Sequence, residues 1–571
     1  MKPSRVLLIR PPIHVRSLRY PAGPRFGVPI SLLYLAAVLE RDGTEVAIYD
    51  ALVDFTWAGI EKNDAGNLHI GASWAALVTK VRDYGPQIVG ITNPFSDFAD
   101  YAIKAAQEIK KACPEVVTVL GGPHATVVPE AFLADGTGID YVVRGEGEIT
   151  LLNLVHALAG EGPVESIPGI SYRARGGGAK GGGAQDPAAI VNNPAAPFIT
   201  DLDDLPLPAY HLVPMEKYFE LVRLGFPSRF TFEYPGCERE VSIITSRGCP
   251  FKCVYCGNHL HMGRRWRYNS VPHVLKHIEL LTTRYGVNHI HIEDDNIGLD
   301  PARFESILDG IAERNWRITW DTSNGIRFEG LTPHLLKKMK DAGCAYVLLG
   351  IDSGNQGVLD RIIGKRLDLG NVVETVRTCK RLNLDAHGLY VVGFPGETRK
   401  EIEDTFNFAK MILKGFDVVP HLCLARPLPG TDLNDICEEQ GYLTEPVLPE
   451  IGSEYRTEIY PRVMIKTEWF TPQDLERWVA RFNRQVITII IAKSLWWLVT
   501  RPQVVPSVTR KFVHDLHRGF ADSVKRMFFG GLLFKFNYLS PNLRKKFTGR
   551  SLAAWKQAGR SGSSGRSEEP R

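Results

Sequence analysis

The chain has 571 residues, of which 44% are apolar and 23% are charged. At about 150 residues per domain, this length predicts roughly three to four domains. The composition excludes a collagen, a fully disordered chain and a small disulfide scaffold. The 68 basic and 64 acidic side chains give a formal net charge of +4, which is too near zero to indicate a nucleic-acid partner.

The cysteines and the apolar segments indicate a cytoplasmic protein. Nine cysteines are an odd number, and three of them lie within eight residues, whereas a secreted disulfide framework spreads an even number along the chain. The N-terminal sequence MKPSRVLLIRPP lacks the features of a signal peptide. The longest apolar segment, Val486 to Thr500, is interrupted by Lys493 and is shorter than the roughly 20 residues that span a membrane.

Residues 1–165 alternate short β-branched runs with segments of helical period. The predicted strands are VLLIR, EVAIYD, IVGIT, VVTVLGG and YVVRG, and the predicted helices lie at Ser31–Arg41, Ala72–Asp83, Asp100–Ala112 and after Glu148. This alternation predicts a doubly wound parallel sheet, which binds ligands beyond the carboxyl ends of its strands. Those ends carry the segments TNP, GGPH and RGEGE. We therefore expect a binding crevice there, although Gly-Gly-Pro alone is also common turn chemistry.

A second α/β domain is predicted at residues 236–440. Residues 166–235 are expected to be a linker, because the segment 173–200 is rich in Gly, Ala and Pro and has no periodicity. Six strands follow, most of them separated by helical stretches: VSIITS, HIHIED, RITWDTS, YVLLGID, HGLYVVG and VVPHLCLA. Six strand–helix units predict a partial (β/α)6 barrel, with its active site at the carboxyl ends of the strands.

The first barrel strand is followed by a C-x3-C-x2-C motif formed by Cys249, Cys253 and Cys256. Three thiolates on one loop can bind an iron–sulfur cube and leave its fourth iron open. The alternative is a structural zinc site completed by Cys237, His259 or His261, but the loop lacks a second C-x2-C pair. We expect the remaining cysteines to be core residues: Cys113, Cys344, Cys379, Cys423 and Cys437.

This motif at the end of a first barrel strand resembles the signature of radical S-adenosylmethionine enzymes. In that family the three cysteines hold a 4Fe–4S cluster, and S-adenosylmethionine chelates the fourth iron. One-electron reduction then cleaves the sulfonium to methionine and a 5′-deoxyadenosyl radical. The resemblance implies that Cys249, Cys253 and Cys256 are the cluster ligands and that Tyr255 contacts the adenine.

Later strand ends also resemble the S-adenosylmethionine site of that family. The resemblance implies that Asp294 or Asp295 receives the ammonium group of the cofactor, although the usual glycine pair is missing. Gly350-Ile351-Asp352-Ser353 resembles the family's G-I-E-S segment, which implies a contact of Asp352 and Ser353 with the ribose or the methionyl end. The other expected contacts follow the third and fifth strands: Asn324, Arg327 and the loop from Gly393 to Glu397. Each has a plainer alternative, because an Asp often caps a helix and the Gly393 loop can be a simple turn.

The N-terminal domain resembles the cobalamin-binding domain of one large radical S-adenosylmethionine subclass, which includes the class B methyltransferases and the anaerobic magnesium-protoporphyrin ester cyclases. The matching segments are residues 19–39, VLGGPHATVVPEAFL and IDYVVRGEGE. The implied cobalamin contacts are Gly121, Gly122, Pro123, His124, Arg144, Gly145 and Glu146. The D-x-H-x-x-G segment of other cobalamin domains is absent, so we expect no axial protein histidine and a structural role for His14 and His124. A domain that has kept the fold but lost the corrinoid is the alternative.

The C-terminal region, residues 441–545, is predicted to be helical, basic and amphipathic, and residues 546–571 are predicted to be a disordered tail. Between Arg501 and Arg571 there are 15 basic and 4 acidic residues, and apolar residues recur every three or four positions after Arg510. Such helices bind anionic membrane surfaces, which predicts a peripheral site on the inner face of the membrane. Packing of the apolar stripe on the barrel is an equal alternative.

Together these features predict an oxygen-sensitive enzyme with a 4Fe–4S cluster, S-adenosylmethionine and cobalamin as cofactors. The resemblance implies that it methylates an unactivated carbon of a hydrophobic substrate, such as a lipid, an isoprenoid or a tetrapyrrole. A flavodoxin or a ferredoxin is the expected electron donor. Two alternatives remain: a cobalamin-dependent radical cyclase or C–C coupling enzyme, and a non-catalytic membrane-associated iron–sulfur protein.

Overall fold

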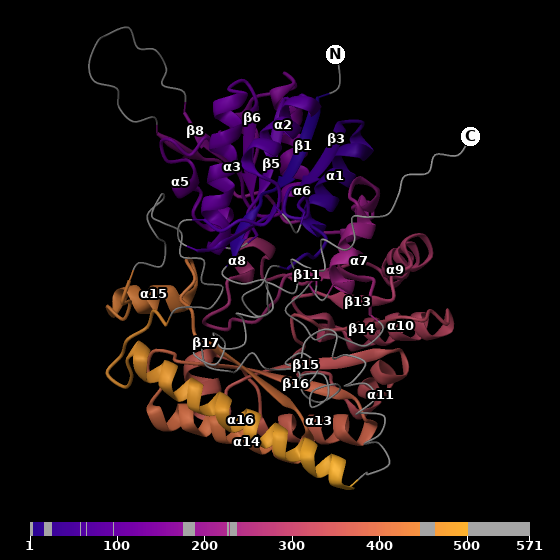
Figure 1. Ribbon diagram of the computed structural model, residues 1–571, viewed down its shortest axis with the longest axis vertical. Helices are drawn as coiled ribbons and strands as arrows, with labels where there is room; N and C mark the ends of the chain where they lie inside the picture. The colour runs from indigo at the N-terminus through magenta and orange to yellow at the C-terminus, as the bar shows by residue number, and fades with distance from the viewer. Residues whose placement is uncertain are drawn as a thin grey trace.

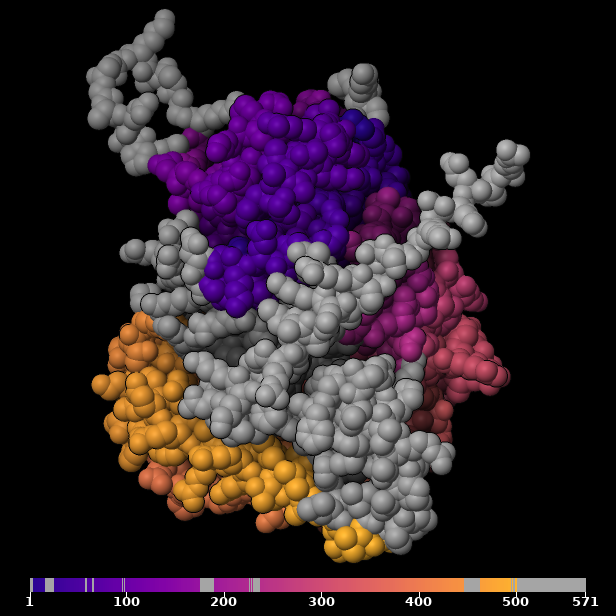
Figure 2. All heavy atoms as spheres, viewed as in Figure 1, coloured from indigo at the N-terminus to yellow at the C-terminus, as the bar shows by residue number. Residues whose placement is uncertain are grey.

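The computed structural model of the chain describes residues 4–15, 25–56, 59–63, 66–94, 96–174, 189–224, 226, 228, 237–445 and 463–500. Two α/β domains lie one above the other in the view of Figure 1, and a long helix crosses the lower one. Figure 2 shows the N-terminal domain, in indigo and purple, seated over the second domain.

The N-terminal domain is built on a parallel sheet with helices on both faces. Its parallel strands are β1 (Arg5–Arg10), β3 (Glu45–Asp50), β5 (Ile88–Thr92), β6 (Val117–Gly121) and β7 (Tyr141–Val143), in the order β3-β1-β5-β6-β7. Leu7 and Ile9 lie in the core with α2 (Trp74–Tyr84) and α3 (Ala99–Ala112). Val6 and Leu8 lie in the opposite core with α1 (Ile30–Asp42) and α6 (Gly147–Leu158). Burial on both faces explains the continuous apolar runs of these strands, and the predicted doubly wound sheet is confirmed.

The edge of this sheet carries two antiparallel strands that the sequence pattern does not predict. β8 (Ile170–Arg173) pairs with β7, and β9 (Ile190–Asn192) pairs with β8. These strands extend the N-terminal sheet into the residues that the sequence pattern assigns to the linker. Both strands are short and flank a Gly- and Ala-rich segment, so they leave no periodicity in the sequence. A separate short hairpin pairs β2 (Ile13–Val15) with β4 (Leu68–Ile70).

The second domain contains a six-stranded parallel sheet in sequence order. The strands are β10 (Glu240–Ile243), β13 (His289–Ile292), β14 (Thr319–Asp321), β15 (Cys344–Asp352), β16 (Asp385–Val392) and β17 (Val419–Leu424). Every neighbouring pair is parallel. Among the described residues β10 does not pair with β17, so the sheet forms the predicted partial barrel. The helices between the strands are α9 (Val271–Tyr285), α10 (Pro301–Glu313), α11 (Pro333–Asp341), α13 (Leu369–Leu382) and α14 (Arg399–Phe416).

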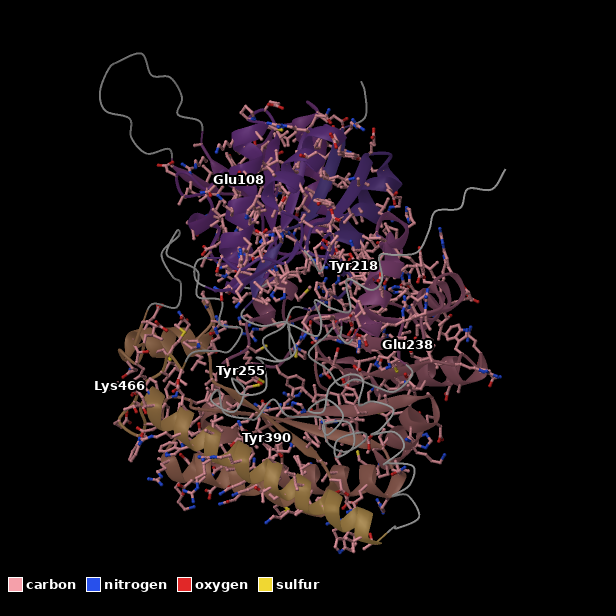
Figure 3. All side chains as sticks on the ribbon, in the orientation of Figure 1. Glu108, Tyr218, Glu238, Tyr255, Tyr390 and Lys466 are labelled. Carbon is pink, nitrogen blue, oxygen red and sulfur yellow. The ribbon has the colours of Figure 1, made fainter. Side chains whose placement is uncertain are left out.

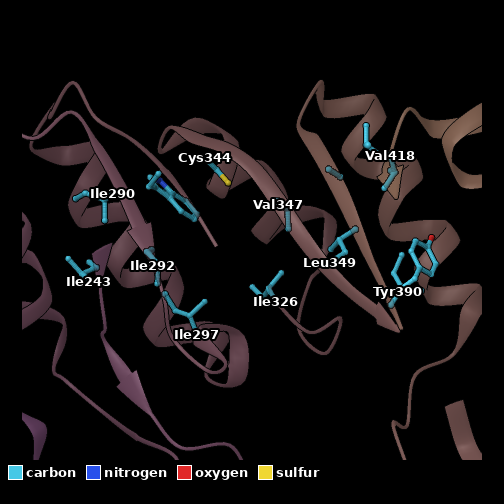
Figure 4. Close-up of a cluster of buried hydrophobic side chains, with 14 of the residues drawn as sticks. Ile243, Ile290, Ile292, Ile297, Ile326, Cys344, Val347, Leu349, Tyr390 and Val418 are labelled. Carbon is cyan, nitrogen blue, oxygen red and sulfur yellow. The ribbon is translucent and has the colours of Figure 1, made fainter. Parts of the chain in front are cut away.

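Alternate residues of the barrel strands face the helices and form the core of the domain. Figure 4 shows part of this core, including Ile243, Ile290, Ile292 and Leu349. The residues between them point to the other face of the sheet, because neighbouring side chains of a strand alternate. Polar residues begin several helices: Ser270, Asp300, Thr332, Asp368 and Thr398 each accept a hydrogen bond from a backbone N–H group of the first turn, which stabilises the helix start.

The C-terminal helix α16 (Pro472–Thr500) packs on α14. The rings of Phe406 and Phe482 stack with their centroids 4.8 Å apart. Lys493, which interrupts the apolar run, donates to the carbonyl oxygen of Lys414 at 2.8 Å. Among the described residues no helix is long and apolar enough to cross a membrane. The predicted basic helix after Arg510 and the predicted tail lie outside the described residues.

The two domains are joined by a buried group of charges, which we call the interdomain ion cluster: Glu146, Glu148, Arg247 and Arg267. Arg247 donates to Glu146 at 3.1 Å and to Glu148 at 2.7 Å, and Arg267 donates to Glu146 at 2.8 Å. All four side chains are at most 8% exposed. Arg247 lies in the short strand β11 (Ser246–Arg247), which pairs with β12 (Arg267–Tyr268). Each charge therefore has an opposite partner across the domain boundary.

We expect Arg247→Met to destabilise the protein by roughly 3–5 kcal/mol, because it leaves the buried Glu148 carboxylate without its partner. The measurement is the free energy of unfolding in urea. Arg381→Met is the matched control, since Arg381 is 62% exposed and pairs with the exposed Glu374, and it should cost less than about 1 kcal/mol. Equal losses in the two variants would show that the interdomain ion cluster contributes no more than a surface pair.

Candidate functional site

The cysteine motif forms a loop beyond the carboxyl end of β10. Cys249, Cys253 and Cys256 are free and partly buried. Gly248 precedes them with a φ of +85°, and a Cβ atom there would clash with the carbonyl oxygen of Arg265, so this position requires glycine. The backbone N–H of Cys256 donates to the carbonyl of Cys253 at 3.0 Å. The loop is therefore folded tightly by its own backbone.

The three thiols have the chemistry of metal ligands. Burial raises the pKa of each thiol, that of Cys256 to about 11, so without a metal all three hold their protons at neutral pH. A metal centre stabilises the thiolate form. The loop thus presents three sulfur donors, and a 4Fe–4S cluster is the group that fits three cysteines on one short loop.

The zinc alternative does not fit this geometry. Two thiolates on one zinc ion lie roughly 3.8 Å apart, because each Zn–S bond is about 2.3 Å long. In the described part of the chain, only one group of three or more His, Cys, Asp or Glu has all its ligand atoms within 4.8 Å of one another, and it does not include the cysteine loop. Cys237 lies 3.3 Å from the hydroxyl of Thr319, near the amino ends of the strands, so it cannot complete a zinc site on this loop.

Two carboxylates that follow β13 hold the start of the cysteine loop. Asp294 is buried and accepts hydrogen bonds at 2.6 Å from the backbone N–H of Thr245, the hydroxyl of Thr245 and the hydroxyl of Ser246. Asp295 accepts one from the backbone N–H of Gly248 at 2.8 Å. Burial raises the pKa of both carboxyl groups. Both residues therefore position the loop, and the contact with the ammonium group of S-adenosylmethionine stays a prediction.

Asp352, at the end of β15, is hydrogen-bonded to Tyr255 of the cysteine loop. Asp352 ends β15 with a φ of +65°, a backbone conformation that costs energy in a residue other than glycine. Its Oδ2 accepts hydrogen bonds from the hydroxyl of Tyr255 and from the ammonium group of Lys365, both at 2.9 Å. Figure 3 shows Tyr255 below the N-terminal domain and above Tyr390 of β16 in the view. The predicted adenine-contacting and ribose-contacting positions are thus brought together.

The other predicted S-adenosylmethionine residues lie around the same edge. Arg327 stacks on Phe251, with its guanidinium carbon 3.6 Å from the ring centroid, and lies 3.8 Å from the sulfur of Cys253. The amide of Asn324 donates to the carbonyl of Glu293 at 2.6 Å. Ser353 is fully buried and bonds to the hydroxyl of Thr405 at 2.9 Å, which is a contact within the fold.

The Gly393 loop is closed by a buried carboxyl group. Glu397 accepts hydrogen bonds from the backbone N–H groups of Gly393 at 2.7 Å and Phe394 at 3.1 Å. Burial raises the pKa of Glu397 to about 8. The ring of Phe394 lies against that of Tyr255, with centroids 5.9 Å apart. The loop thus supports Tyr255, a role that the sequence motif does not reveal.

At the predicted ligand-binding edge of the N-terminal sheet, Asn93 follows β5 and Gly122 follows β6. Gly122 has a φ of +131°, and a Cβ atom there would clash with the carbonyl oxygen of Asn93. Asn93 is fully buried, and its side-chain nitrogen and oxygen have no hydrogen-bond partner. An unsatisfied buried amide at the carboxyl end of a strand is what a polar ligand at this edge would complete. These residues therefore fit a bound corrinoid.

The predicted structural histidines have contacts within the fold. His124 bonds to Ser96 at 3.0 Å, and its ring meets Phe132 edge to face. His14 lies 3.3 Å from a ring nitrogen of His69, and burial lowers its pKa to about 4.

The RGEGE segment has contacts beyond those expected of a cobalamin loop. The backbone N–H of Gly145 donates to the hydroxyl of Thr126 at 3.0 Å, which ties the loop to α4 (Pro123–Val127). Arg144 bonds to the carbonyl of Asn193. Glu146 is an expected cobalamin contact, but its carboxylate accepts hydrogen bonds from Arg247 and Arg267. Sequence reasoning missed this pairing, because no short motif links residues that lie a hundred positions apart.

The two halves of the site approach each other directly. The short helix α8 (Asn258–Met262) begins two residues after Cys256 and contacts α4, which begins at Pro123. A Cβ atom added to Gly430 would lie 3.0 Å from Leu260 and 3.1 Å from Val127, so these three residues are packed together. The cysteine loop therefore lies next to the edge of the N-terminal sheet at which its parallel strands end.

One expected core cysteine is not in the core. Cys423 is exposed, whereas Cys113, Cys344, Cys379 and Cys437 are buried. Residues two apart in a strand share a face, so Cys423 lies on the same face as His421, which bonds to His387 across the sheet at 3.2 Å. The prediction for Cys423 is wrong, because its apolar strand context does not reveal which face of the sheet is open.

We expect Glu397→Gln to change how stability depends on pH. The pKa of this carboxyl group rises from about 4.5 in the unfolded chain to about 8 on folding. Its contribution to the free energy of unfolding is therefore fully present below pH 4.5 and is lost as the pH rises through 8. Glutamine cannot ionise. Between pH 5 and pH 9, the free energy of unfolding of wild type should therefore fall by on the order of 3 kcal/mol relative to that of the variant. The measurement is urea unfolding of both proteins across this range.

Glu403→Gln is the matched control, because Glu403 lies on α14 and is exposed beside Arg399. Its unfolding free energy should follow wild type at every pH. Parallel curves for wild type and Glu397→Gln would contradict the assignment of a protonated Glu397.

Comparison with protein families supports both halves of the site. Residues 24–155 match the B12 binding domain, and residues 243–409 match the radical SAM superfamily. An uncharacterised methyltransferase of Pyrococcus horikoshii is 33% identical over 435 residues, which cover 76% of this chain and 83% of the relative. The cytidylyl-2-hydroxyethylphosphonate methyltransferase of Streptomyces wedmorensis is 30% identical over 477 residues, which cover 81% of this chain and 86% of the relative.

A solved structure with the same fold contains two of the three expected cofactors. The cobalamin-dependent S-adenosylmethionine radical enzyme OxsB, with aqua-cobalamin and S-adenosylmethionine bound, matches with a TM-score of 0.63 and 15% identity, over 98% of this chain and 71% of OxsB. At this identity the likeness shows the fold alone. Together with the two methyltransferase relatives and both family matches, it identifies the chain as a member of the cobalamin-dependent radical S-adenosylmethionine methyltransferases, which use a 4Fe–4S cluster, S-adenosylmethionine and cobalamin.

Proposed function

We propose that this protein transfers a methyl group to an unactivated carbon of a hydrophobic small molecule. Support for the substrate class comes from more distant relatives. The hopanoid C-3 methylase of Methylococcus capsulatus is 23% identical over 71% of this chain, and a bacteriochlorophyllide d methyltransferase of Chlorobaculum tepidum is 26% identical over 36% of it. Hopanoids and chlorophyllides are both largely apolar, so a lipid, an isoprenoid or a tetrapyrrole is the proposed class.

The observation that carries methyl transfer is the contact between α8 and α4. It sets the loop of Cys249, Cys253 and Cys256 beside the edge of the N-terminal sheet that carries Asn93 and Gly122, where we propose that the corrinoid binds. A substrate held between the two loops faces both at once, and such positioning can supply a large part of a rate enhancement. When bound, the cluster and S-adenosylmethionine supply a radical that removes hydrogen from carbon, and the corrinoid supplies the methyl group.

The residues of the chain fix the geometry of this reaction. Asp294 and Asp295 hold the start of the cysteine loop, and Asp352 orients the hydroxyl of Tyr255. Lys365 balances the charge of Asp352 in a buried setting, where both side chains are at most 6% exposed. A rigid, partly buried surround of this kind keeps water and oxygen away from a reactive site.

The first test compares Cys253→Ala with Cys379→Ala under anaerobic conditions. After iron and sulfide reconstitution, reduced wild type should release 5′-deoxyadenosine from S-adenosylmethionine. Cys253→Ala should lose at least roughly 100-fold of this activity, because the cluster loses one of its three ligands. Cys379 is buried on α13, so Cys379→Ala should keep both the cluster and the product. Unchanged 5′-deoxyadenosine from Cys253→Ala would reject this cluster, and none from wild type would favour the non-catalytic alternative.

The second test separates methylation from ring chemistry by product mass. A gain of one methylene unit per substrate, dependent on added cobalamin, is the result expected for methyl transfer. A loss of hydrogen or a gain of oxygen would instead favour the cyclase or coupling alternative. That alternative is supported by the anaerobic magnesium-protoporphyrin IX monomethyl ester cyclase of Cereibacter sphaeroides, which is 26% identical over 67% of this chain.

The substrate panel must also include polar molecules. The Streptomyces wedmorensis relative, at 30% identity, is named for a cytidylyl phosphonate, which favours a nucleotide-linked substrate as the second candidate. Methylation of such a molecule alone, with none of the apolar substrates, would keep the proposed reaction and overturn the proposed substrate class.

The proposed partner is a flavodoxin or a ferredoxin, because the reaction needs single electrons at low potential. Contact with an anionic membrane surface stays a prediction, since it concerns the basic segment after residue 500, which lies outside the described residues.

A further inference from the structure

A second group of ligand-type side chains lies on the inner face of the barrel sheet, away from the cysteine loop. It consists of His289 and His291 on β13 and Asp321 on β14, and we call it the histidine–aspartate group. The three residues are at most 1% exposed. They alternate with Ile290, Ile292 and Trp320, which face the helices. Glu240 on β10 is the neighbour of His289 across the sheet.

The three side chains converge on a single point. The Oδ2 atom of Asp321 lies 2.8 Å from Nδ1 of His291 and 3.0 Å from Nε2 of His289. One ligand atom of each residue lies within 4.8 Å of the others. Two donors bound about 2.05 Å from one ion are roughly 2.9 Å apart at a right angle and roughly 3.3 Å apart at the tetrahedral angle. The spacing is therefore close to that of ligands around a single ion.

The outer contacts of the group also match those of metal-binding histidines. Nδ1 of His289 lies 2.7 Å from the hydroxyl of Thr319, and metal-bound imidazoles commonly use their second nitrogen in this way, with an oxygen partner that fixes the ring. Nε2 of His291 faces Oε2 of Glu240 at 3.5 Å, without forming a hydrogen bond. Oδ1 of Asp321 is buried and has no hydrogen-bond partner, so this carboxylate keeps one oxygen with unused lone pairs.

The charges of the group also favour a cation. Glu240 and Asp321 bring two carboxylates into one buried place. A divalent ion held by the group would offset the two negative charges in this buried place.

We propose that His289, His291 and Asp321 bind one zinc-class divalent ion, separate from the cluster on the cysteine loop. Two imidazoles and one carboxylate are a nitrogen and oxygen donor set that suits such an ion better than calcium or magnesium. The ion would join β13 to β14 below the point where Asp294 and Asp295 leave β13. Its role is structural: it fixes the strand that carries the two carboxylates holding the cysteine loop.

The test measures zinc in the full-length, reconstituted holoprotein after equilibration with Zn²⁺ and removal of loosely bound metal. We expect about one zinc per chain, and zinc-edge X-ray absorption should show nitrogen and oxygen neighbours with no sulfur. Asp321→Asn and His291→Gln should each retain at least tenfold less zinc. His387→Gln is the matched control, because His387 is also buried on the inner face, beside His421, and it should retain one zinc.

Three outcomes would overturn the site. Wild type that retains less than a tenth of a zinc per chain would leave the group as a proton-sharing network. Sulfur neighbours in the absorption spectrum would place the ion on cysteine, and full retention in both ligand variants would place it elsewhere. The spectrum of wild type is informative by itself, so the test does not depend on whether Asp321→Asn folds.

Discussion

The interdomain ion cluster is the constraint on which the arrangement of the site depends. Arg247 stands two residues before Cys249, and its partners Glu146 and Glu148 follow the last parallel strand of the N-terminal sheet. Buried charges tolerate little displacement, because separating them leaves each one unpaired in a medium of low polarity. The pairing therefore fixes the position of the cysteine loop relative to the edge of the N-terminal sheet. The contact between α8 and α4 then brings the two halves of the site together by van der Waals packing.

Carboxylates at the ends of barrel strands have two roles in this protein. In the sequence, Asp294, Asp295 and Asp352 resemble cofactor ligands. In the structure, each also satisfies buried donors of the chain: backbone N–H groups and hydroxyls for the first two, and the Tyr255 hydroxyl and Lys365 ammonium for the third. A loop that carries three metal ligands gains from such anchors, since they fix its backbone in addition to the packing of Val254 and Tyr255 against the core. Positioning the loop and recognising the cofactor are thus concentrated in a few side chains.

Most of the fold could be predicted from the sequence, because parallel strands buried on both faces give short, continuous apolar runs. The run EVAIYD is β3 and IVGIT is β5, residue for residue. The strand predicted at VSIITS ends earlier, at Ile243, because Thr245 and Ser246 turn aside to bond to Asp294. The three cysteines could be predicted to act together because their spacing is local. The pairing of Glu146 with Arg247, the support of Asp352 by Lys365 and the exposure of Cys423 could not, since each depends on which distant segments meet.

The antiparallel edge of the N-terminal sheet has a practical consequence. Arg173 on β8 is the register partner of Ile190 on β9, so the two strand ends are already held together by the sheet. The free energy of closing a chain between fixed ends grows only with the logarithm of its length. An epitope, a fluorescent label or a surface anchor could therefore be inserted between these strands at small energetic cost. The hairpin offers a handle for immobilising the enzyme anaerobically while the cofactor face stays accessible.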